Sequence, residues 1–255
     1  MPDTAALPTL LKALSPEVTN GSCLARQWEA LQEQALHQRW TLAQYLAALC
    51  EQALAHRHTQ RLQRYLKESG LPTGKTLGQF DFKACPSVTA ARIAQLAHDP
   101  DGVARAENLL LFGPSGVGKT HLATAIGYGL IEHGRRVYFA ATTDLVQPLQ
   151  IAKRARRLPD ALGKLDKYGV LILDDIGYVK KSELESSVLF ELIAHRYESG
   201  SLVITSNQPF SAWDSVFPDA IMTVAAIDRL VHHAQIIELQ GESYRKAQSL
   251  RRRTA

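Results

Sequence analysis

Residues 109–120 join an apolar run to a glycine-rich loop that ends in Lys119 and Thr120, with the sequence Leu-Leu-Leu-Phe-Gly-Pro-Ser-Gly-Val-Gly-Lys-Thr. The glycines of this loop let the backbone turn tightly and point its N–H groups inward around a phosphate. Lys119 supplies a cation for the terminal phosphates of a nucleotide, and Thr120 supplies a hydroxyl ligand for Mg²⁺. We therefore predict a nucleotide site, because a purely structural turn would explain Gly113 but not residues 118–120.

A second polar group follows the apolar run at residues 170–173, where Asp174 and Asp175 are adjacent. A buried strand has no use for two carboxylates at its end unless a cation or a reacting group meets them. Asp174 is the simplest partner for the Mg²⁺ of a bound nucleotide, and Asp175 would orient or deprotonate an attacking water. The alternative is a solvated acidic turn, which the glycine-rich loop makes the weaker interpretation.

A third apolar run, at residues 202–205, also ends in polar side chains, and Asn207 follows it. The amide of Asn207 can hold a water molecule or a γ-phosphate oxygen. Asn is also a common turn residue, so Asn207 by itself is a weak indication of a site.

These polar groups need a scaffold, and the chain contains five short β-rich runs separated by segments long enough for helices. The runs span residues 108–112, 137–140, 170–173, 202–205 and 236–239. Strands that are apolar along their whole length are buried on both faces, which predicts an α/β fold with a five-stranded parallel sheet flanked by helices. The phosphate loop then lies at the carboxyl end of a strand, where open α/β sheets bind ligands.

The first 72 residues have a different pattern, which predicts a small all-helical domain ahead of the α/β domain at residues 73–255. Apolar residues recur there at the helical period over three expected helices, and Thr41 with Gln44 matches a capping box for the second. We expect a frayed arm before the first helix and a linker at residues 70–74, Gly-Leu-Pro-Thr-Gly.

The composition is that of a folded globular protein, with 45% apolar and 21% charged residues among 255. No window approaches the roughly 18 apolar residues of a membrane span, and the N-terminus does not resemble a signal peptide. We therefore expect no membrane association and a cytoplasmic location. Cys23, Cys50 and Cys85 lack a C-x-x-C spacing, so neither a disulfide framework nor a zinc site is expected.

The formal net charge is only +4 at pH 7, but the basic residues are clustered. One cluster comprises Lys153, Arg154, Arg156 and Arg157, a second comprises Arg245, Lys246 and residues 251–253, and a third runs along the last expected helix of the first domain as Arg57, Arg61, Arg64 and Lys67. Clustered positive charge on a nucleotide-binding protein favours a polyanionic partner such as DNA, although charge runs are more often solvated. We predict DNA contact by the first cluster, without a groove-reading motif for sequence-specific recognition.

The phosphate loop, the Asp174-Asp175 pair, Asn207 and the string Ala-Ile-Asp-Arg-Leu at 226–230 resemble, in this order, the AAA+ ATPases of the DnaC/DnaA-like branch. Further strings resemble the IstB family of transposition helper ATPases. These are Phe-Asp-Phe at 80–82, Gly-Lys-Thr-His-Leu-Ala at 118–123, Leu-Asp-Asp-Ile-Gly-Tyr at 173–178, Ser-Asn-Gln at 206–208 and Gly-Glu-Ser-Tyr-Arg at 241–245. The resemblance covers nearly the whole chain.

This resemblance implies an ATPase that uses ATP and Mg²⁺, assembles on double-stranded DNA as a homo-oligomer, and works with an IstA-type transposase. It assigns the nucleotide contacts to Gly113, Pro114, Ser115, Gly116, Val117, Gly118, Lys119, Thr120, His121 and Arg245. Thr120 and Asp174 would bind the metal, and Asp175 and Asn207 would act in hydrolysis. Arg229 matches the arginine finger that reaches the nucleotide of the neighbouring subunit, so that the ATP site is shared between subunits.

The second Walker B acid is commonly Glu in AAA+ proteins and is Asp175 here, which predicts slow, regulatory hydrolysis. Three other functions are compatible with parts of this pattern. A DnaC-like loader of a replicative helicase is poorly separated from a transposition helper by the sequence. A P-loop kinase for a small molecule lacks an evident acceptor site and does not explain Arg229. A nucleotide-gated scaffold without turnover would need only the binding residues, and an ATPase assay distinguishes it.

Overall fold

The computed structural model describes residues 23–177, 182–217, 219–241 and 243–244. Its contacts divide the chain into two compact units, residues 1–64 and 65–255. The division falls within helix α3 (Leu42–Ser69). The domain boundary that the sequence places after residue 72 stays a prediction.

The first unit contains α2 (Cys23–His37) and most of α3. The capping box before α3 is confirmed, because the Thr41 N–H donates to Oε1 of Gln44 at 2.8 Å and the Gln44 N–H donates to the Thr41 hydroxyl at 3.3 Å. The expectation of two separate helices after Thr41 was wrong. α3 runs unbroken for 28 residues, since neither glycine nor proline interrupts it.

The second unit is built on a five-stranded parallel sheet with the strand order β2-β3-β4-β1-β5. The strands are β1 (Asn108–Phe112), β2 (Val137–Ala141), β3 (Val170–Asp174), β4 (Ser201–Ser206) and β5 (Ala234–Glu238). Leu110 of the inner strand β1 pairs with Ile204 of β4 on one side and with Ile236 of β5 on the other. All residues of β1 and β4 are buried, as expected for strands that are covered on both faces.

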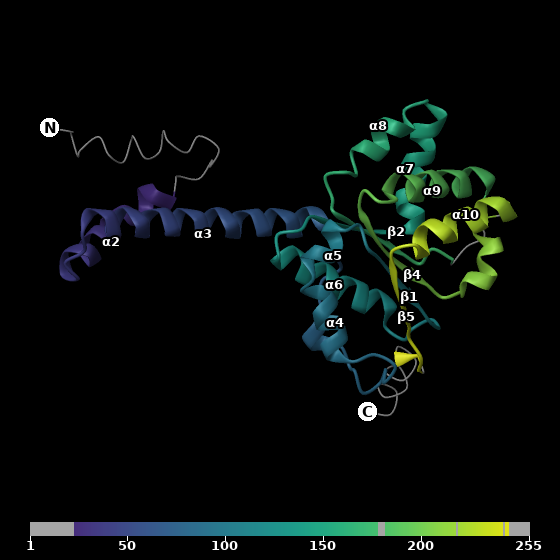
Figure 1. Cartoon of the computed structure of the whole chain (residues 1–255), viewed down its shortest axis with the longest axis horizontal. Helices are drawn as coiled ribbons and strands as arrows, with labels where there is room; N and C mark the ends of the chain where they lie inside the picture. The colour runs from purple at the N-terminus through teal and green to yellow at the C-terminus, as the bar shows by residue number, and fades with distance from the viewer. Residues whose placement is uncertain (1–22, 178–181, 218, 242, 245–255) are drawn as a thin grey trace. The chain divides into compact units, whose positions relative to one another are not determined.

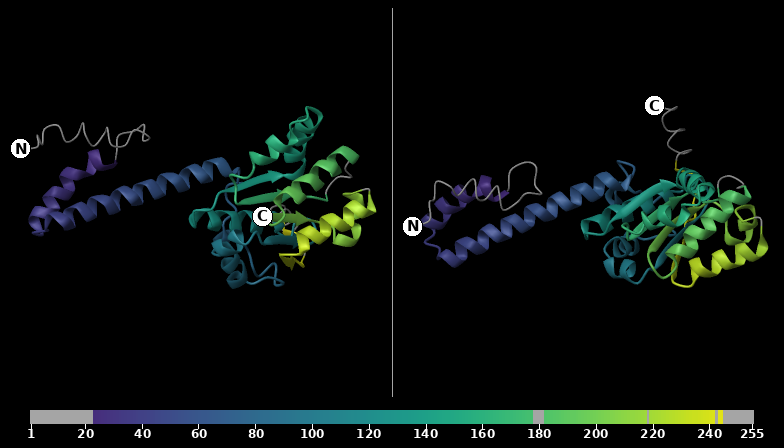
Figure 2. Two further views of the ribbon diagram at one scale, coloured as in Figure 1. Left: turned by 45° about the horizontal axis from the view of Figure 1, so that its top comes forward. Right: turned by 90° about the horizontal axis from the view of Figure 1, so that it is seen from above.

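Helices cover both faces of this sheet (Figures 1 and 2). One face packs against α7 (Thr142–Arg154), α8 (Leu158–Gly163), α9 (Glu183–Arg196), α10 (Ala220–Val231) and the 3-10 turn η3 (Phe210–Ser215). The other face packs against α4 (Ala90–Ala97) and α6 (Lys119–Glu132). The short helix α5 (Pro100–Ala104) and the 3-10 turn η2 (Leu77–Gln79) add Val103 and Leu77 to the same core. Successive strand residues such as Leu110 and Leu111 point to opposite faces of the sheet and pack into the hydrophobic core on each face. The predicted fold class is confirmed.

The carboxyl ends of three strands position the residues that the sequence singles out. β1 ends at Phe112 before the phosphate loop, and Phe112 pairs with Ser206, the last residue of β4. β3 ends at Asp174, next to β4 in the sheet. The topology therefore brings all three polar groups to one edge. No helix in the described part of the chain is long and apolar enough to span a membrane.

Candidate functional site

The phosphate loop has the backbone that its glycines predict. Gly113, Gly116 and Gly118 adopt φ angles of 145°, 88° and 108°, a region that residues with a side chain rarely adopt. Neighbouring groups also leave no space for a Cβ, which would collide with Ser243 at position 116 and with Phe80 at position 118. The loop is thus held by close packing as well as by its own turn.

Lys119 and Thr120 begin α6 directly after this loop. The Lys119 side chain is buried, and its Nζ donates to the carbonyls of Gly113 at 2.7 Å and Pro114 at 2.8 Å. The Thr120 hydroxyl donates to the two carboxylate oxygens of Asp174 at 2.9 and 3.1 Å. A hydroxyl beside a carboxylate is an oxygen donor set that suits Mg²⁺. The two predicted metal ligands are therefore in direct contact.

The Asp174-Asp175 turn is tied to the neighbouring strand. The Thr205 hydroxyl donates to Oδ1 of Asp174 at 2.7 Å, and the Asp174 carbonyl accepts from the Thr142 hydroxyl at 2.9 Å. Asp175 has a left-handed φ of 55°, which costs of order 1–3 kcal/mol for a residue with a side chain. This turn exposes Asp175 at the cavity beside the phosphate loop.

Asn207 follows β4 at the same edge. Its Oδ1 is buried and has no hydrogen-bond partner within the described residues. It lies beside Gly177, where a Cβ would come within 3.5 Å of it. An unpaired buried acceptor costs free energy until a donor meets it. This position therefore fits the predicted contact of Asn207 with a water molecule.

A cavity of about 320 Å³ adjoins the phosphate loop. Residues 115–121 and Asp175 line it together with Lys75, Gln79, Phe80, Asp81, Ala84, Cys85 and Tyr244. The rings of Phe80 and His121 meet edge to face with centroids 5.3 Å apart, and Nε2 of His121 lies 2.8 Å from the Thr76 carbonyl oxygen. A phosphate loop and aromatic side chains around one cavity suit a nucleotide.

Several residues of this region were not predicted as site residues, and they include Thr205, Cys85 and Tyr244. Thr205 holds the aspartate turn, Cys85 lines the cavity, and the Tyr244 N–H donates to the Gly116 carbonyl at 3.1 Å. For Thr205 a signal existed, because it lies two residues before Asn207 and therefore on the same face of the strand. For Cys85 and Tyr244 only the tertiary structure shows the contact. Arg245 and the basic tail at residues 251–253 lie outside the described residues.

Arg229 does not line the cavity of its own chain. Its Nη1 donates to the Ala225 carbonyl at 2.9 Å, and its Cζ lies 5.2 Å from the centroid of the Phe190 ring. The next residue, Leu230, accepts a hydrogen bond from the side chain of Asn108 at the start of β1. The backbone of Arg229 thus lies toward the amino end of the sheet.

The predicted DNA-binding cluster falls into two parts. Nζ of Lys153 lies 2.6 Å from both Oε1 of Glu191 and the hydroxyl of Ser187, so Lys153 is engaged by α9. Arg154, Arg156 and Arg157 are exposed at and beyond the end of α7. These three arginines are the members of the cluster that present their side chains to solvent.

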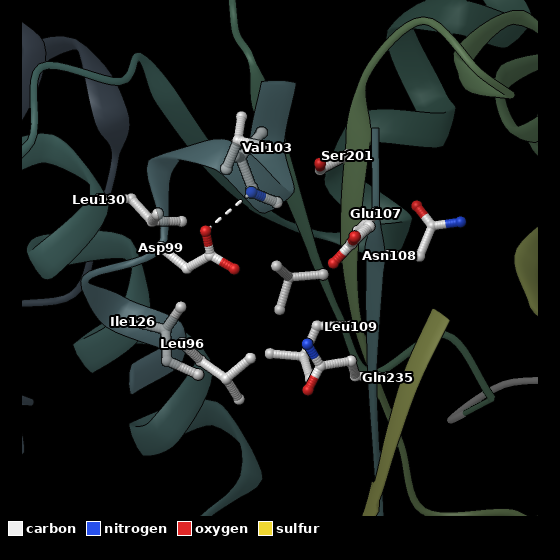
Figure 3. A pocket seen from close by; sticks show the side chains of 13 residues that line it. Leu96, Asp99, Val103, Glu107, Asn108, Leu109, Ile126, Leu130, Ser201 and Gln235 are labelled. Atoms are coloured by element: carbon white, nitrogen blue, oxygen red, sulfur yellow. Dashed lines mark hydrogen bonds between the residues drawn. The ribbon is translucent and has the colours of Figure 1, made fainter. Parts of the chain in front are cut away.

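A second, smaller cavity of about 40 Å³ lies at the amino end of the strands (Figure 3). Its lining is largely apolar, and two of its polar residues, Asp99 and Asn108, serve the fold. Asp99 accepts from the Gly102 N–H at 2.9 Å at the start of α5, and Asn108 bonds the backbone of Leu230 and Leu202. The volume suits one or two water molecules, not a nucleotide.

Solved structures share this fold. The structure of DnaI matches with a TM-score of 0.54 and 21% identity, covering 68% of this chain and 96% of that one. AMPPCP-bound DnaA from Aquifex aeolicus matches with a TM-score of 0.55 and 17% identity, covering 72% and 56%. The α/β unit therefore has the same fold as these DnaI and DnaA structures.

Sequence relatives show the family. An insertion-sequence ATP-binding protein of Sinorhizobium fredii is 52% identical over 88% of this chain and 75% of its own length. The ATP-binding protein of insertion sequence IS21 from Pseudomonas aeruginosa is 40% identical over 85% and 82%. The family model described as IstB-like ATP binding protein matches residues 18–252. The chain therefore belongs to the IstB-like ATP binding proteins.

Proposed function

We propose that this protein is an ATP-hydrolysing helper of DNA transposition, which oligomerises on double-stranded DNA and recruits or activates its cognate transposase. The observation that carries the ATPase part is the convergence of five polar side chains at one edge of the sheet. They are Lys119, Thr120, Asp174, Asp175 and Asn207, of which Lys119, Thr120 and Asp175 line the cavity. The family membership and the AAA+ fold support the ATP-binding role of this cavity.

Each of these residues has a distinct chemical role in the proposed reaction. Lys119 exchanges its two carbonyl partners for phosphate oxygens and neutralises their charge. Thr120 and Asp174 would hold Mg²⁺, which supplies charge neutralisation for phosphoryl transfer. Asp175 orients or deprotonates the attacking water, and Oδ1 of Asn207, which is buried and has no partner among the described residues, accepts a hydrogen bond from that water.

The position of Arg229 supports an ATP site shared between subunits. Its guanidinium lies on Phe190 and does not line the cavity of its own chain. An arginine that is supplied by a neighbour stabilises the charge of the transition state. Hydrolysis would then depend on assembly, and the short carboxylate of Asp175 fits slow, regulatory turnover.

Duplex DNA is the polyanion that we propose for the exposed arginines Arg154, Arg156 and Arg157. A DnaC-like loader of a replicative helicase is the second candidate, because the fold is shared with DnaC-type proteins. The names of the more similar relatives favour transposition, since they are ATP-binding proteins of insertion sequences.

Two measurements test this function. ATP hydrolysis is measured with and without duplex DNA for the wild type and for Asp175→Asn, which should bind ATP normally and hydrolyse it about 10²–10⁴-fold more slowly. This variant, trapped with ATP, is then used for affinity capture from cells that carry the neighbouring genes. A captured transposase supports the proposal, and a captured replicative helicase supports the loader instead. A wild type without ATP turnover would contradict the ATPase.

A further inference from the structure

Thr205 lies next to the Asp174-Asp175 turn, and the proposed reaction assigns no role to it. It is a fully buried residue of β4. Three hydrogen bonds join it to three successive residues of the neighbouring strand end. Its hydroxyl donates to Oδ1 of Asp174 at 2.7 Å and accepts from the Asp175 N–H at 2.9 Å, and its carbonyl accepts from the Ile176 N–H at 3.0 Å.

The hydroxyl of Thr205 uses its hydrogen-bonding capacity on both aspartates at once. A threonine hydroxyl has one hydrogen to donate and lone pairs to accept with. The hydrogen goes to the carboxylate of Asp174, and a lone pair takes the N–H of Asp175. One oxygen atom therefore fixes the side chain of the first acid and the backbone of the second.

This double contact matters because the turn at Asp175 is strained. Asp175 has a φ of 55°, and such a conformation persists only where its surroundings hold it. The bond from its N–H to Thr205 is one such restraint. Without it, the Asp175 N–H would lose its acceptor and the carboxylate would no longer be aimed at the cavity.

We propose that Thr205 is a positioning residue that couples the metal-binding acid Asp174 to the water-orienting acid Asp175, an inference that rests on the proposed ATPase function. The hydroxyl holds both carboxylates in position beside the cavity, and it contacts neither the nucleotide nor the attacking water in the proposed reaction. Thr120 retains its own bonds to Asp174 when the Thr205 hydroxyl is removed. Nucleotide binding should therefore survive that removal, and hydrolysis should not.

Among the described residues, the other hydroxyls near the sheet do not make this double contact. Thr142 donates to the backbone carbonyl of Asp174 and not to its carboxylate. Ser201 lies at the opposite end of the same strand, is equally buried, and its Oγ has no hydrogen-bond partner in the described part of the chain. Ser201→Ala is thus a matched control for the loss of a buried hydroxyl from β4.

The test compares Thr205→Val, which keeps the shape and loses the hydroxyl, with Thr205→Ser, which keeps the hydroxyl. In the protein without nucleotide or metal, amide hydrogen exchange at Asp175 should accelerate at least tenfold in Thr205→Val and stay near the wild-type rate in Thr205→Ser and Ser201→Ala. The kcat for ATP should fall roughly 100-fold in Thr205→Val, since small misplacements of catalytic groups have effects of that order. The Kd for ATP without Mg²⁺ should change less than about twofold, because the phosphate loop is untouched.

Equal losses in Thr205→Val and Thr205→Ser would overturn the proposal, because they would show that packing alone matters. The proposal would also be overturned if the Asp175 amide of Thr205→Val exchanged its hydrogen at the wild-type rate. If Thr205→Val does not fold, Thr205→Ala provides the same comparison with Thr205→Ser. If the wild type itself hydrolyses no ATP, the proposed function fails, while exchange at Asp175 still decides whether Thr205 holds the turn.

Discussion

At the carboxyl end of the sheet, Lys119 lines a cavity of about 320 Å³, and Asp174 bonds to Thr120, which also lines it. At the amino end, Asn108 and Arg196 are buried as well, and they bond to backbone groups of the fold. Asn108 joins the Leu230 carbonyl to the Leu202 N–H, and Arg196 donates to a backbone carbonyl at 2.9 Å. Burial lowers the pKa of Arg196 below its usual value, although Asp166 nearby opposes the shift.

The difference shows how to separate function from stability among buried polar residues of one sheet. Groups that line a cavity of nucleotide size can exchange their partners for a ligand, as we propose for the two carbonyl partners of Lys119. Asn108 lies beside a cavity that suits only one or two water molecules, so an exchange there would leave buried donors or acceptors unpaired. Changes at the carboxyl end should therefore alter nucleotide chemistry, and changes at the amino end should alter the free energy of unfolding.

The largest expected effect is that of replacing Arg229. This residue lies toward the amino end of the sheet and yet is proposed to act on a nucleotide. Arg229→Ala should keep ATP binding and lose hydrolysis by about 10³–10⁵-fold, as for arginines supplied in trans elsewhere. Mixing it with Asp175→Asn should restore turnover in steady-state assays, since each variant contributes what the other lacks. No recovery at any mixing ratio would place the action of Arg229 within its own chain.

Lys119→Ala tests the carboxyl end directly. The ammonium makes charged hydrogen bonds worth about 1.5–3 kcal/mol each, so losing two of them should weaken ATP binding about 100-fold or more in calorimetry. The midpoint of urea unfolding without nucleotide should stay close to that of the wild type. Near-wild-type affinity would show that the loop does not bind the phosphates.

Asn108→Ala is the matched change at the amino end. It leaves the Leu230 carbonyl and the Leu202 N–H unpaired, which should lower the free energy of unfolding by about 2–4 kcal/mol. Urea denaturation measures this loss. The Kd for ATP, measured below the unfolding transition, should remain within about twofold, and a larger change would mean that the two ends are not independent.

The smallest expected effect comes from changes in the basic cluster. They test whether exposed charge outside the cavity contributes to DNA binding. Changing Arg154, Arg156 and Arg157 together to Ala should flatten the log–log salt dependence of duplex DNA binding by up to about 2.7, since each lost phosphate contact contributes about 0.9. Lys153→Ala is the control, and its effect should be smaller because Lys153 is paired with Glu191. An unchanged slope in the triple variant would move the DNA contact elsewhere.

Several features follow from local sequence because their physical causes are local. The glycines and Lys119-Thr120 predict a phosphate loop through backbone freedom, charge and a helix start. The apolar runs predict a parallel sheet, and the rule that such strands share a carboxyl edge brings Asp174 and Asn207 to the loop. The unbroken α3 was not predicted, because a helical period does not reveal whether two helical segments join.

The sequence by itself thus determined the fold class, the family resemblance and the main acids and cations of the site. Only the tertiary structure decided which groups hold them. Thr205 meets Asp174 and Asp175, Lys153 meets Glu191, and Tyr244 meets the phosphate loop across long stretches of chain. Such contacts depend on strand order and helix packing, which no periodicity or short motif encodes.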